Sequence, residues 1–471
     1  MAVIKQIPFN HASTIALHPP KRAANPFAFA MTSKPNGLTS RHATTTQFLS
    51  ILALLVVKTT ALDNGLALTP AMGFNAWYAL HHHLTSPGYE WEKGYVLSED
   101  VLQVAQWMKQ NGYLSLGYKY MNFDDCIVVN RTSDGTLVPD PQAFPHGVLN
   151  VSDTLHAMGF KLGWYTDRGE YTCSCWEGGL KRPGSEGHEK QDAATYAAWG
   201  IDYLKEDSCN AGGQNAVDAF ATMRDALNVT KRPIYFNLCW GAGETVAKVG
   251  KTLGNAWRIS VDDGGGWAPV MKNVEVDNGL YMYSGPGGWN DPGLLVAGLS
   301  LSTKSTGASN RSHPKYRPAA AAAAMTDVQG RTQFNLWSIL AAKLLISADP
   351  RTFSAYTNET YTNAEVIAVD QDPMGKQGKR FTPAGNSTNP GEVWGRQIHD
   401  GWALLFFNNN GTKAIDIECN SACWAQTGIN PNQKVNVRDL WKHQDLGSIN
   451  GSYTVHSIEP DASVMLKLTQ G

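Results

Sequence analysis

The chain has 471 residues, of which 39 are lysine or arginine and 41 are aspartate or glutamate, so its formal net charge at pH 7 is −2. This length is sufficient for one barrel-sized domain and a smaller second domain, with ample apolar core. A net charge of −2 and a pI near 6.7 argue against a nucleic-acid or anionic-membrane partner. We therefore expect neither as a partner.

The N-terminal region is predicted to direct targeting. Residues 1–61 contain no aspartate or glutamate, and residues 48–57 form a ten-residue apolar run followed by Lys58-Thr59-Thr60-Ala61. Such a run is too short to cross a membrane comfortably and is typical of a signal peptide, with cleavage near Ala61. Met31 is an alternative start, and a plastid or mitochondrial transit peptide is an alternative interpretation.

Glycosylation sites favour the secretory route. The chain has eight Asn-x-Ser/Thr sequons, at Asn130, Asn150, Asn228, Asn310, Asn358, Asn386, Asn410 and Asn450. Sequons of this kind mark surface loops of secreted proteins. We expect a glycoprotein of the secretory pathway, either secreted or delivered to a lysosome or vacuole, with no membrane association after signal cleavage.

Between residues 62 and 370, apolar runs alternate with helix-like segments. Eight short apolar runs end in polar, acidic, cysteine or glycine residues, at 71–77, 118–123, 162–165, 200–204, 233–238, 256–261, 280–283 and 344–346. Segments such as 100–111 and 191–199 lie between them. Repeated strand and helix with polar strand ends predicts an α/β fold, a parallel (β/α)8 TIM barrel with its active site at the carboxyl ends of the strands.

The run at 200–204 continues into Lys205-Glu206-Asp207. Side chains alternate along a strand, so Lys205 and Asp207 share one face, and Glu206 faces the helix layer, where it needs a partner or solvent. The lysine cation is expected to lower the pKa of Asp207 and keep it ionised, as a nucleophile requires. A lone Lys-x-Asp is usually a simple ion pair, but polar strand ends recur along this chain.

Two tracts of the barrel region are predicted to lie in loops. His81-His82-His83 has no cysteine or carboxylate pattern, so we expect no metal site there. Residues 300–327 are polar and of low complexity, with alanines at 319–324. We expect this insertion to be a surface loop with a short helix, and a roof over the active site is the alternative.

A different pattern begins after Asp372. Mostly β-favouring runs follow at 392–397, 402–407, 413–418, 435–440 and 463–468. Short strands separated by turns, without long helical segments, are typical of antiparallel sheets. Residues 371–471 are therefore predicted to form a C-terminal antiparallel β-sandwich domain behind a catalytic barrel at 62–370.

Seven ordered motifs carry a family resemblance. They lie at 72–77, 123–126, 162–167, 199–205, 257–262, 285–292 and 366–373. From about Leu62 to the C-terminus, the chain resembles glycoside hydrolase family 27 of clan D, the α-galactosidases and α-N-acetylgalactosaminidases (melibiases). The resemblance implies a retaining glycosidase with a barrel and a sandwich, and neither a metal nor an organic cofactor.

The resemblance also assigns roles to individual residues. Retaining glycosidases place two carboxylates about 5–5.5 Å apart; here Asp207 resembles the nucleophile and Asp262 the acid/base. Asp263 is the rival for the second role, but the family spacing from Arg258 selects Asp262. The implied substrate-binding residues are Trp77, Asp124, Asp125, Tyr165, Lys205, Trp240 and Arg258. For Trp77 and Tyr165, packing in the core is the alternative.

Seven cysteines are consistent with an oxidising compartment, but they cannot all be paired. The resemblance implies two disulfides, Cys173–Cys209 and Cys419–Cys423. The family partner of Cys126 is replaced by His82, so Cys126, Cys175 and Cys239 compete for pairing. At least one thiol is expected to stay free.

Departures from the family concern the pocket for the sugar's 2-substituent. Gly293 and Leu294 replace the usual acidic residue and methionine, and the loop from Cys239 through Trp240 lacks a glutamate common in α-galactosidases. Losing two acidic contacts puts recognition of a 2-hydroxyl group in doubt. Restoring the acid with Gly293→Asp is expected to raise kcat/KM for galactosides.

These observations predict an enzyme, a retaining exo-glycosidase that removes terminal α-D-galactosyl residues from oligosaccharides or glycoconjugates. The alternatives are α-N-acetylgalactosaminidase and β-L-arabinopyranosidase, which share the machinery. A non-catalytic galactoside-binding protein is favoured by Glu206 and Gly293 and opposed by the intact acid pair. The expected partner is an α-galactoside carbohydrate, and a homodimer is left open.

Overall fold

The structure, a computed structural model, describes residues 62, 64–80, 96–173, 181–264, 266–299, 324–383, 385–386, 388–409 and 411–470. The predicted targeting region, the histidine tract, Cys175, most of the 300–327 insertion, and the sequons Asn310 and Asn410 lie outside these residues. Within the described ranges, no helix is long and apolar enough to span a membrane.

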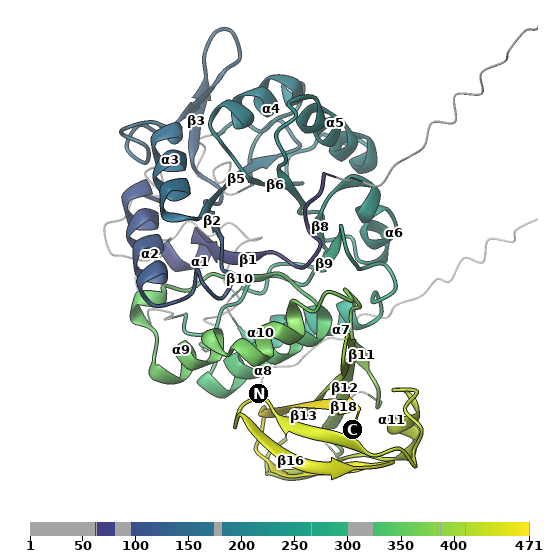
Figure 1. Ribbon diagram of the computed structural model, residues 1–471. Helices are drawn as coiled ribbons and strands as arrows, with labels where there is room; N and C mark the ends of the chain where they lie inside the picture. Colours follow the sequence, from purple (N-terminus) through teal and green to yellow (C-terminus); the bar gives the residue numbers. More distant parts are fainter. Residues whose placement is uncertain are drawn as a thin grey trace, which may run out of the picture. The chain divides into compact units, whose positions relative to one another are not determined.

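Eight parallel strands form one curled sheet in the order β10-β1-β2-β5-β6-β7-β8-β9 (Figure 1). Their bounds are β1 Met72–Asn75, β2 Tyr120–Asn122, β5 Lys161–Asp167, β6 Tyr203–Asp207, β7 Tyr235–Leu238, β8 Ala256–Arg258, β9 Trp289–Asp291 and β10 Leu344–Ile346. Leu295, which follows β9, lies beside β10. It forms a parallel bridge with Ile346, and its N–H donates to Leu345 O at 2.9 Å. This contact completes the predicted barrel.

Helices line the outer side of this sheet (Figure 1). Their bounds are α1 Ala76–Leu80, α2 Ser98–Gln110, α3 Val148–Met158, α4 Glu189–Ala198, α5 Ala216–Val229, α6 Glu244–Leu253, α7 Trp267–Asn278, α8 Asp327–Leu340, the 3-10 helix η3 Pro350–Thr352, α9 Ala355–Thr362 and α10 Ala364–Asp370. In α2, Val101, Val104 and Met108 recur at helical spacing and are buried, which explains why this face packs inward. Asn215 caps α5 through its side-chain oxygen.

The predicted seventh strand at 280–283 is wrong. These residues form a turn after α7, in which the Leu280 N–H donates to Asp277 O at 2.9 Å. The seventh barrel strand is instead β9, which follows a tight turn bridged between Gly285 and Gly288. We predicted that the glycine-rich motif at 285–292 would follow the seventh strand. The motif instead contains that strand, β9.

The first predicted strand is longer than the observed one. Strand β1 ends at Asn75, and Trp77 lies in the short helix α1, where its N–H donates to Asn75 Oδ1 at 2.9 Å. The asparagine side chain accepts this backbone group and so turns the chain out of the strand. A hairpin of β3 Val128–Arg131 and β4 Leu137–Pro139 was not predicted.

The C-terminal region consists of antiparallel sheets. One has the order β11-β12-β13-β18-β15-β16, and β14 pairs with β17 in another. The bounds are β11 Lys379–Arg380, β12 Gly391–Ile398, β13 Gly401–Asn408, β14 Ile415–Cys419, α11 Ser421–Ala425, β15 Val435–Asp439, β16 Gln444–Ile449, β17 Tyr453–Ile458 and β18 Ser463–Gln470. Leu404, Phe406 and Trp424 belong to a separate core here. The predicted class, a (β/α)8 barrel followed by an antiparallel β-sandwich, is confirmed.

Candidate active site

Side chains from three barrel strands meet around Asp124. This carboxylate follows β2, and 2% of its side chain is exposed. It accepts hydrogen bonds from Lys205 Nζ at 3.1 Å to each oxygen and from Asn75 Nδ2 at 2.9 Å. Because Lys205 belongs to β6 and Asn75 to β1, the carboxyl ends of these strands share one charged cluster.

Asp207, the last residue of β6, is held in place by its neighbours. The Tyr165 hydroxyl donates to Asp207 Oδ2 at 3.1 Å, and the Ser208 N–H donates to Oδ1 at 2.9 Å. Lys205 Nζ lies 3.8 Å from Oδ2. The Asp207 side chain is 16% exposed, so it is oriented and still accessible to a small molecule.

The pKa of Asp207 differs from expectation. Burial raises this pKa, the Lys205 cation opposes the rise, and the negative charge of Asp262 adds to it. The predicted lowering is therefore wrong in its net direction, although the lysine acts in the predicted sense. Desolvation outweighs the lysine because the ammonium group lies closer to Asp124 than to Asp207.

Lys205 stays protonated in this cluster. Burial alone would lower its pKa, but the charges around it, that of Asp124 foremost, raise the pKa instead. Its Nζ also lies 4.9 Å from the centre of the Tyr165 ring. The lysine thus presents a fixed positive charge between two carboxylates and an aromatic face.

The neighbouring acids Asp262 and Asp263 have opposite surroundings. Arg258 Nη1 donates to Asp262 Oδ1 at 2.6 Å, and the Asp262 side chain is 52% exposed. Removal from water would raise the pKa of Asp262, but the Arg258 charge outweighs it and the pKa is lowered. Asp263 is buried and accepts from the Leu294 N–H at 3.0 Å. Only the first of these two carboxylates is open to a substrate.

An alternating series of charges continues from Arg258 into the barrel. Arg258 Nε lies 3.5 Å from Asp291 Oδ2, and Lys343 Nζ lies 2.8 Å from the same oxygen. Burial would raise the pKa of Asp291, but these two cations lower it to about 2. Lys343 Nζ also donates to Tyr203 Oη and Asn237 Oδ1, each at 2.9 Å.

Sequence reasoning missed this inner network. The sequence offered one kind of signal for these residues, a polar side chain within or beside an apolar strand. Asn237 lies inside the run 233–238, and Lys343 directly precedes the run 344–346. Such residues face the barrel interior and must find partners there. Because the partners come from different strands, the local sequence does not identify them.

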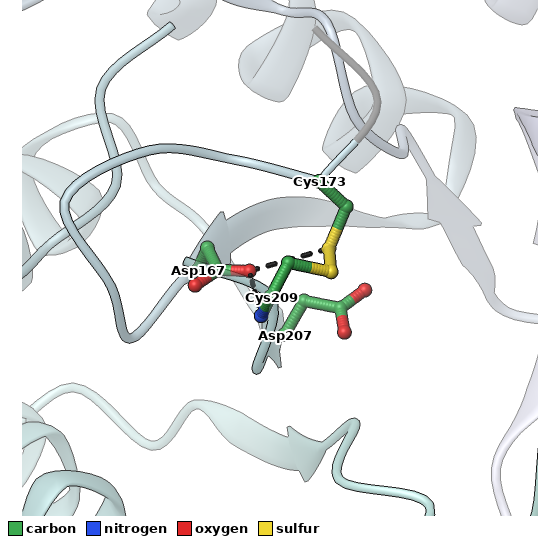
Figure 2. A group of neighbouring side chains, drawn as sticks. All are labelled: Asp167, Cys173, Asp207 and Cys209. Carbon is green, nitrogen blue, oxygen red and sulfur yellow. Dashed lines mark hydrogen bonds between the residues drawn. A yellow bond between two sulfur atoms is a disulfide. The ribbon is translucent and has the colours of Figure 1, made fainter. Parts of the chain in front are cut away.

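A third carboxylate, Asp167, lies beside Asp207 and the disulfide Cys173–Cys209 (Figure 2). Asp167 accepts from the N–H groups of Gly169 at 2.8 Å and Cys209 at 2.9 Å. Burial first, and then the Asp207 charge, raises its pKa to about 7. The disulfide occupies both sulfur atoms, so this cluster offers no thiolate to a metal ion.

Three further predicted sugar-binding residues, Asp125, Trp77 and Trp240, follow the carboxyl ends of β2, β1 and β7. The charge of Asp125 is near enough to raise the pKa of Tyr165, after the larger effect of burial. Trp77 is partly buried, with its ring centre 6.5 Å from that of Tyr78. Trp240 is partly buried and packs against Phe220 at 6.0 Å. Direct hydrogen bonds and ion pairs join Asp124, Tyr165, Lys205 and Asp207 in one group and Arg258 with Asp262 in another.

Glu206 faces the helix layer as predicted, but it lacks the expected partner. Its side chain is fully buried, and neither oxygen has a hydrogen-bond partner among the described residues. Burial raises the pKa of Glu206 well above its ordinary value, with Asp167 adding to the rise and Arg168 opposing it. This glutamate is therefore held as a neutral acid.

The structure contains both disulfides that the resemblance implied, Cys173–Cys209 and Cys419–Cys423. Cys126 is also disulfide-bonded. Among the described cysteines, Cys239 is the free one, which agrees with the prediction that a thiol remains unpaired.

The backbone at Gly293 does not suit an acidic side chain. Its φ is +132°, and a Cβ atom there would lie 2.8 Å from Asp263 Oδ2. Asp263 thus already fills the space into which an aspartate side chain at this position would project, and it holds the next backbone N–H. The expectation that Gly293→Asp improves the pocket is therefore not supported by this geometry.

A parallel barrel with several carboxylates at its strand ends is typical of glycoside hydrolases. The chain matches the family described as Alpha galactosidase A over residues 69–310 and 320–372. It also matches the Alpha galactosidase C-terminal beta sandwich domain over residues 388–468. The unmatched residues 311–319 fall inside the predicted insertion.

Individual relatives agree with these matches. The alpha-galactosidase of Cyamopsis tetragonoloba is 35% identical over 410 residues, which cover 86% of this chain and 88% of that protein. The alpha-N-acetylgalactosaminidase of Homo sapiens is 35% identical over 69% of this chain and 74% of its own length. The crystal structure of alpha-galactosidase I from Mortierella vinacea superposes with a TM-score of 0.72 at 26% identity, covering 87% of this chain and 100% of that one. The chain belongs to the Alpha galactosidase A family of glycoside hydrolases.

Proposed function

We propose that this protein is a retaining exo-α-galactosidase with Asp207 as nucleophile and Asp262 as acid/base. The observation that carries the proposal is the contrast between these two carboxylates. Asp207, at the end of β6, accepts a hydrogen bond from the Tyr165 hydroxyl, whereas Asp262 is half exposed and bonded to Arg258. An oriented nucleophile and an accessible proton carrier are the two groups that double displacement requires.

In the first step, an Asp207 oxygen attacks the anomeric carbon while the bond to the aglycone oxygen breaks. Asp262 gives its proton to that departing oxygen. Water then attacks the anomeric carbon, Asp262 takes the proton from the water, and the ester bond to Asp207 breaks. Two inversions at the same carbon leave the product with its original configuration.

The charges around Asp262 suit this change of role. In the free protein Arg258 lowers the pKa of Asp262, and a bound sugar that excludes water raises it, which favours the proton donor. When Asp207 becomes an ester, its negative charge disappears and the pKa of Asp262 falls again. Asp262 is then the better base, as the second step requires.

The β2–β6 cluster provides the groups that bind the sugar ring. Asp124 and Asp125 accept hydrogen bonds from ring hydroxyls, including an axial 4-hydroxyl, and Lys205 donates them. Trp77 forms an apolar platform, Tyr165 a side wall, and Arg258 orients the ring. Trp240 lies beside the sugar's 2-substituent.

A second candidate function, α-N-acetylgalactosaminidase, is favoured by the loop around Cys239 and by Gly293. Neither position carries the acidic residue that would bind a 2-hydroxyl group. We rank it second because the sequence also lacks the small-residue pattern associated with that specificity.

The disulfides fit a protein of the secretory pathway, where such bonds persist. We propose that residues 1–61 direct the chain there, and that the mature enzyme is secreted or reaches a lysosome or vacuole. In this proposal residues 62–370 form the catalytic domain, 371–471 the accessory domain, and a homodimer remains to be tested by light scattering.

Turnover of three nitrophenyl glycosides tests the proposal directly. We expect the highest kcat/KM with the α-galactoside, compared with the α-N-acetylgalactosaminide and the β-L-arabinopyranoside. A higher value for either rival would transfer the assignment to that sugar. Galactose binding without turnover of any of the three would favour the non-catalytic alternative.

A further inference from the structure

A groove of about 420 Å³ has neither of the proposed catalytic carboxylates in its lining. Its wall includes residues 284–286, which precede β9, whereas Asp291 marks the carboxyl end of that strand. Strands β12 and β13 of the C-terminal sheet complete the opposite wall. The groove therefore opens toward the amino end of the barrel, opposite the active-site end.

Three ammonium groups surround this groove. Lys251, Lys376 and Lys379 line it, and its lining contains no aspartate or glutamate. Lys376 Nζ donates to Gln397 Oε1 at 2.5 Å, and Lys379 Nζ lies 5.0 Å from the centre of the Tyr281 ring. None of the three pairs with a carboxylate within the described part of the chain. Their charges are available to an anion.

Aromatic rings form another part of the lining. Trp402 is partly buried and packs edge to face on the buried Phe381, with ring centres 5.6 Å apart, and Tyr281 is 36% exposed. A Cβ atom at Gly395 would lie 2.2 Å from the Phe381 ring, so this glycine lets the ring rest against the β12 backbone. Phe381 therefore supports Trp402 from below, and the rings open to a ligand are those of Tyr281 and Trp402. Aromatic faces beside amide and amine groups are suited to the apolar face and hydroxyls of a pyranose.

We propose that this lysine groove, lined by Lys251, Tyr281, Lys376, Lys379, Phe381 and Trp402, binds an acidic saccharide. The ligand is a sugar ring that carries a carboxylate, sulfate or phosphate group. A bare anion would leave the aromatic rings uncovered, and a neutral sugar would leave three cations unpaired. The volume is within the usual range for small-ligand sites. The inference is independent of which sugar the proposed active site hydrolyses.

Titration of the full-length protein tests this inference. Trigalacturonate, a neutral galactotriose, a sulfated galactose and inorganic sulfate are added separately while saturating galactose occupies the proposed active site. We expect saturable binding of an acidic sugar at least about tenfold tighter than binding of either the neutral sugar or inorganic sulfate. Comparing the uronate with the sulfated sugar identifies the preferred anionic group.

Variants locate the binding site. Lys376→Ala and Lys379→Ala should each weaken binding about tenfold, and Trp402→Phe should weaken it less, while nitrophenyl α-galactoside turnover stays unchanged. Lys434→Ala, an exposed lysine of the C-terminal region outside the groove, is the matched control. The inference is overturned if no acidic sugar binds, if neutral sugar or inorganic sulfate binds as tightly, or if the groove variants bind like Lys434→Ala.

Discussion

On the β2–β6 side of the proposed active site, hydrogen bonds and an ion pair join residues that lie in β6 or shortly after β2. Asp124, Lys205 and Asp207 belong to this nucleophile side. On the β8–β9 side, Arg258 and Asp263 depend on partners from other parts of the barrel, namely Asp291 with Lys343 and the Leu294 backbone. The residues of the nucleophile side lie in short sequence motifs, whereas the acid/base side depends on residues that are far apart in the sequence.

This difference explains where the chain can depart from its family. In the proposed mechanism, a substitution on the nucleophile side removes a group that attacks or binds the sugar, and no neighbouring side chain replaces it. On the acid/base side, the buried Asp263 fills the space beside Gly293 and binds the Leu294 N–H. Activity should therefore tolerate paired changes on that side better than single ones.

The largest effect is expected for Asp207→Ala. Without this carboxylate no covalent glycosyl-enzyme forms, so kcat for nitrophenyl α-galactoside should fall by about 10⁴-fold or more. Galactose binding, followed by calorimetry, should persist because Asp124 and Lys205 remain. Tyr165→Phe is the milder control on the same side and should cost about tenfold. Substantial turnover by the alanine variant would remove Asp207 from the nucleophile role.

A smaller and more selective loss is expected for Asp262→Ala. General acid–base catalysis contributes about 10²–10⁴-fold, so an alkyl galactoside, with its poor leaving group, should suffer most. The nitrophenyl substrate should suffer less, and added azide should restore part of its rate by replacing the activated water. Asp263→Ala is the neighbouring control. Azide rescue of that variant, and not of Asp262→Ala, would show that the wrong aspartate was chosen.

The Gly293→Asp variant tests the exchange of carboxylates on the acid/base side. The new Cβ would meet Asp263 Oδ2 at 2.8 Å, at a φ of +132° that strains any residue except glycine. We expect a loss of roughly 1–3 kcal/mol in stability from the backbone alone, with further loss from two adjacent buried acids, and reduced activity. Removing Asp263 at the same time should reverse part of this loss. Thermal unfolding of both single variants and the double variant measures the coupling between positions 263 and 293. If the two stability changes simply add, the two carboxylates do not compete for the same space.

The sequence predicted the nucleophile side better than the acid/base side for a physical reason. Alternation along β6 places Lys205 and Asp207 together without any knowledge of the fold. It could not predict that burial outweighs the lysine in the pKa of Asp207, because burial depends on the whole barrel. Lys343, Asp291 and Asn237 meet only after the sheet closes, so no local pattern links them.

Strand boundaries show the same limit. Seven barrel strands fell within or beside their predicted runs, but 280–283 proved to be a turn and β9 lay in the following motif. Strand β9 has only three residues. Pairing with its neighbours in the sheet stabilises so short a strand, but three residues are too few to form an apolar run that the sequence would reveal.

Lys343→Met tests whether the buried charges of Lys343 and Asp291 influence the pKa of Asp262. Losing the cation leaves Asp291 to attract Arg258 more strongly and makes the potential at Asp262 more negative. Both effects raise the pKa of Asp262, so the basic limb of kcat/KM should move to higher pH. Stability should also fall, by about 3–5 kcal/mol for a broken buried pair, and Asp291→Asn in the same chain should restore part of it. Lys434→Met is the control; an unchanged pH profile in a folded Lys343→Met protein would limit Lys343 to a structural role.

A further prediction concerns the pH dependence of stability, through three buried acids of the barrel region. Burial raises the pKa of Asp167 beside the nucleophile, and of Asp277 behind β9, to about 7 each, and that of Asp370 to about 8. An unfolded aspartate has a pKa of about 3.9. Between about pH 4 and 8 the folded protein therefore binds more protons than the unfolded chain, and its stability falls as the pH rises, by about 1.4 kcal/mol per pH unit for each group protonated only in the folded state.

The melting temperature should consequently be higher at pH 5 than at pH 8. Asp277 is a suitable group to change, because its Oδ1 accepts from Gln377 Nε2 at 2.9 Å while its Oδ2 has no hydrogen-bond partner among the described residues. Asp277→Asn removes the titration and should raise the melting temperature relative to the wild type at pH 8 more than at pH 5. Asp153→Asn, an exposed aspartate on α3, should leave the pH dependence unchanged. A melting temperature that rises from pH 5 to pH 8 in the wild type would mean that these acids are ionised in the folded protein.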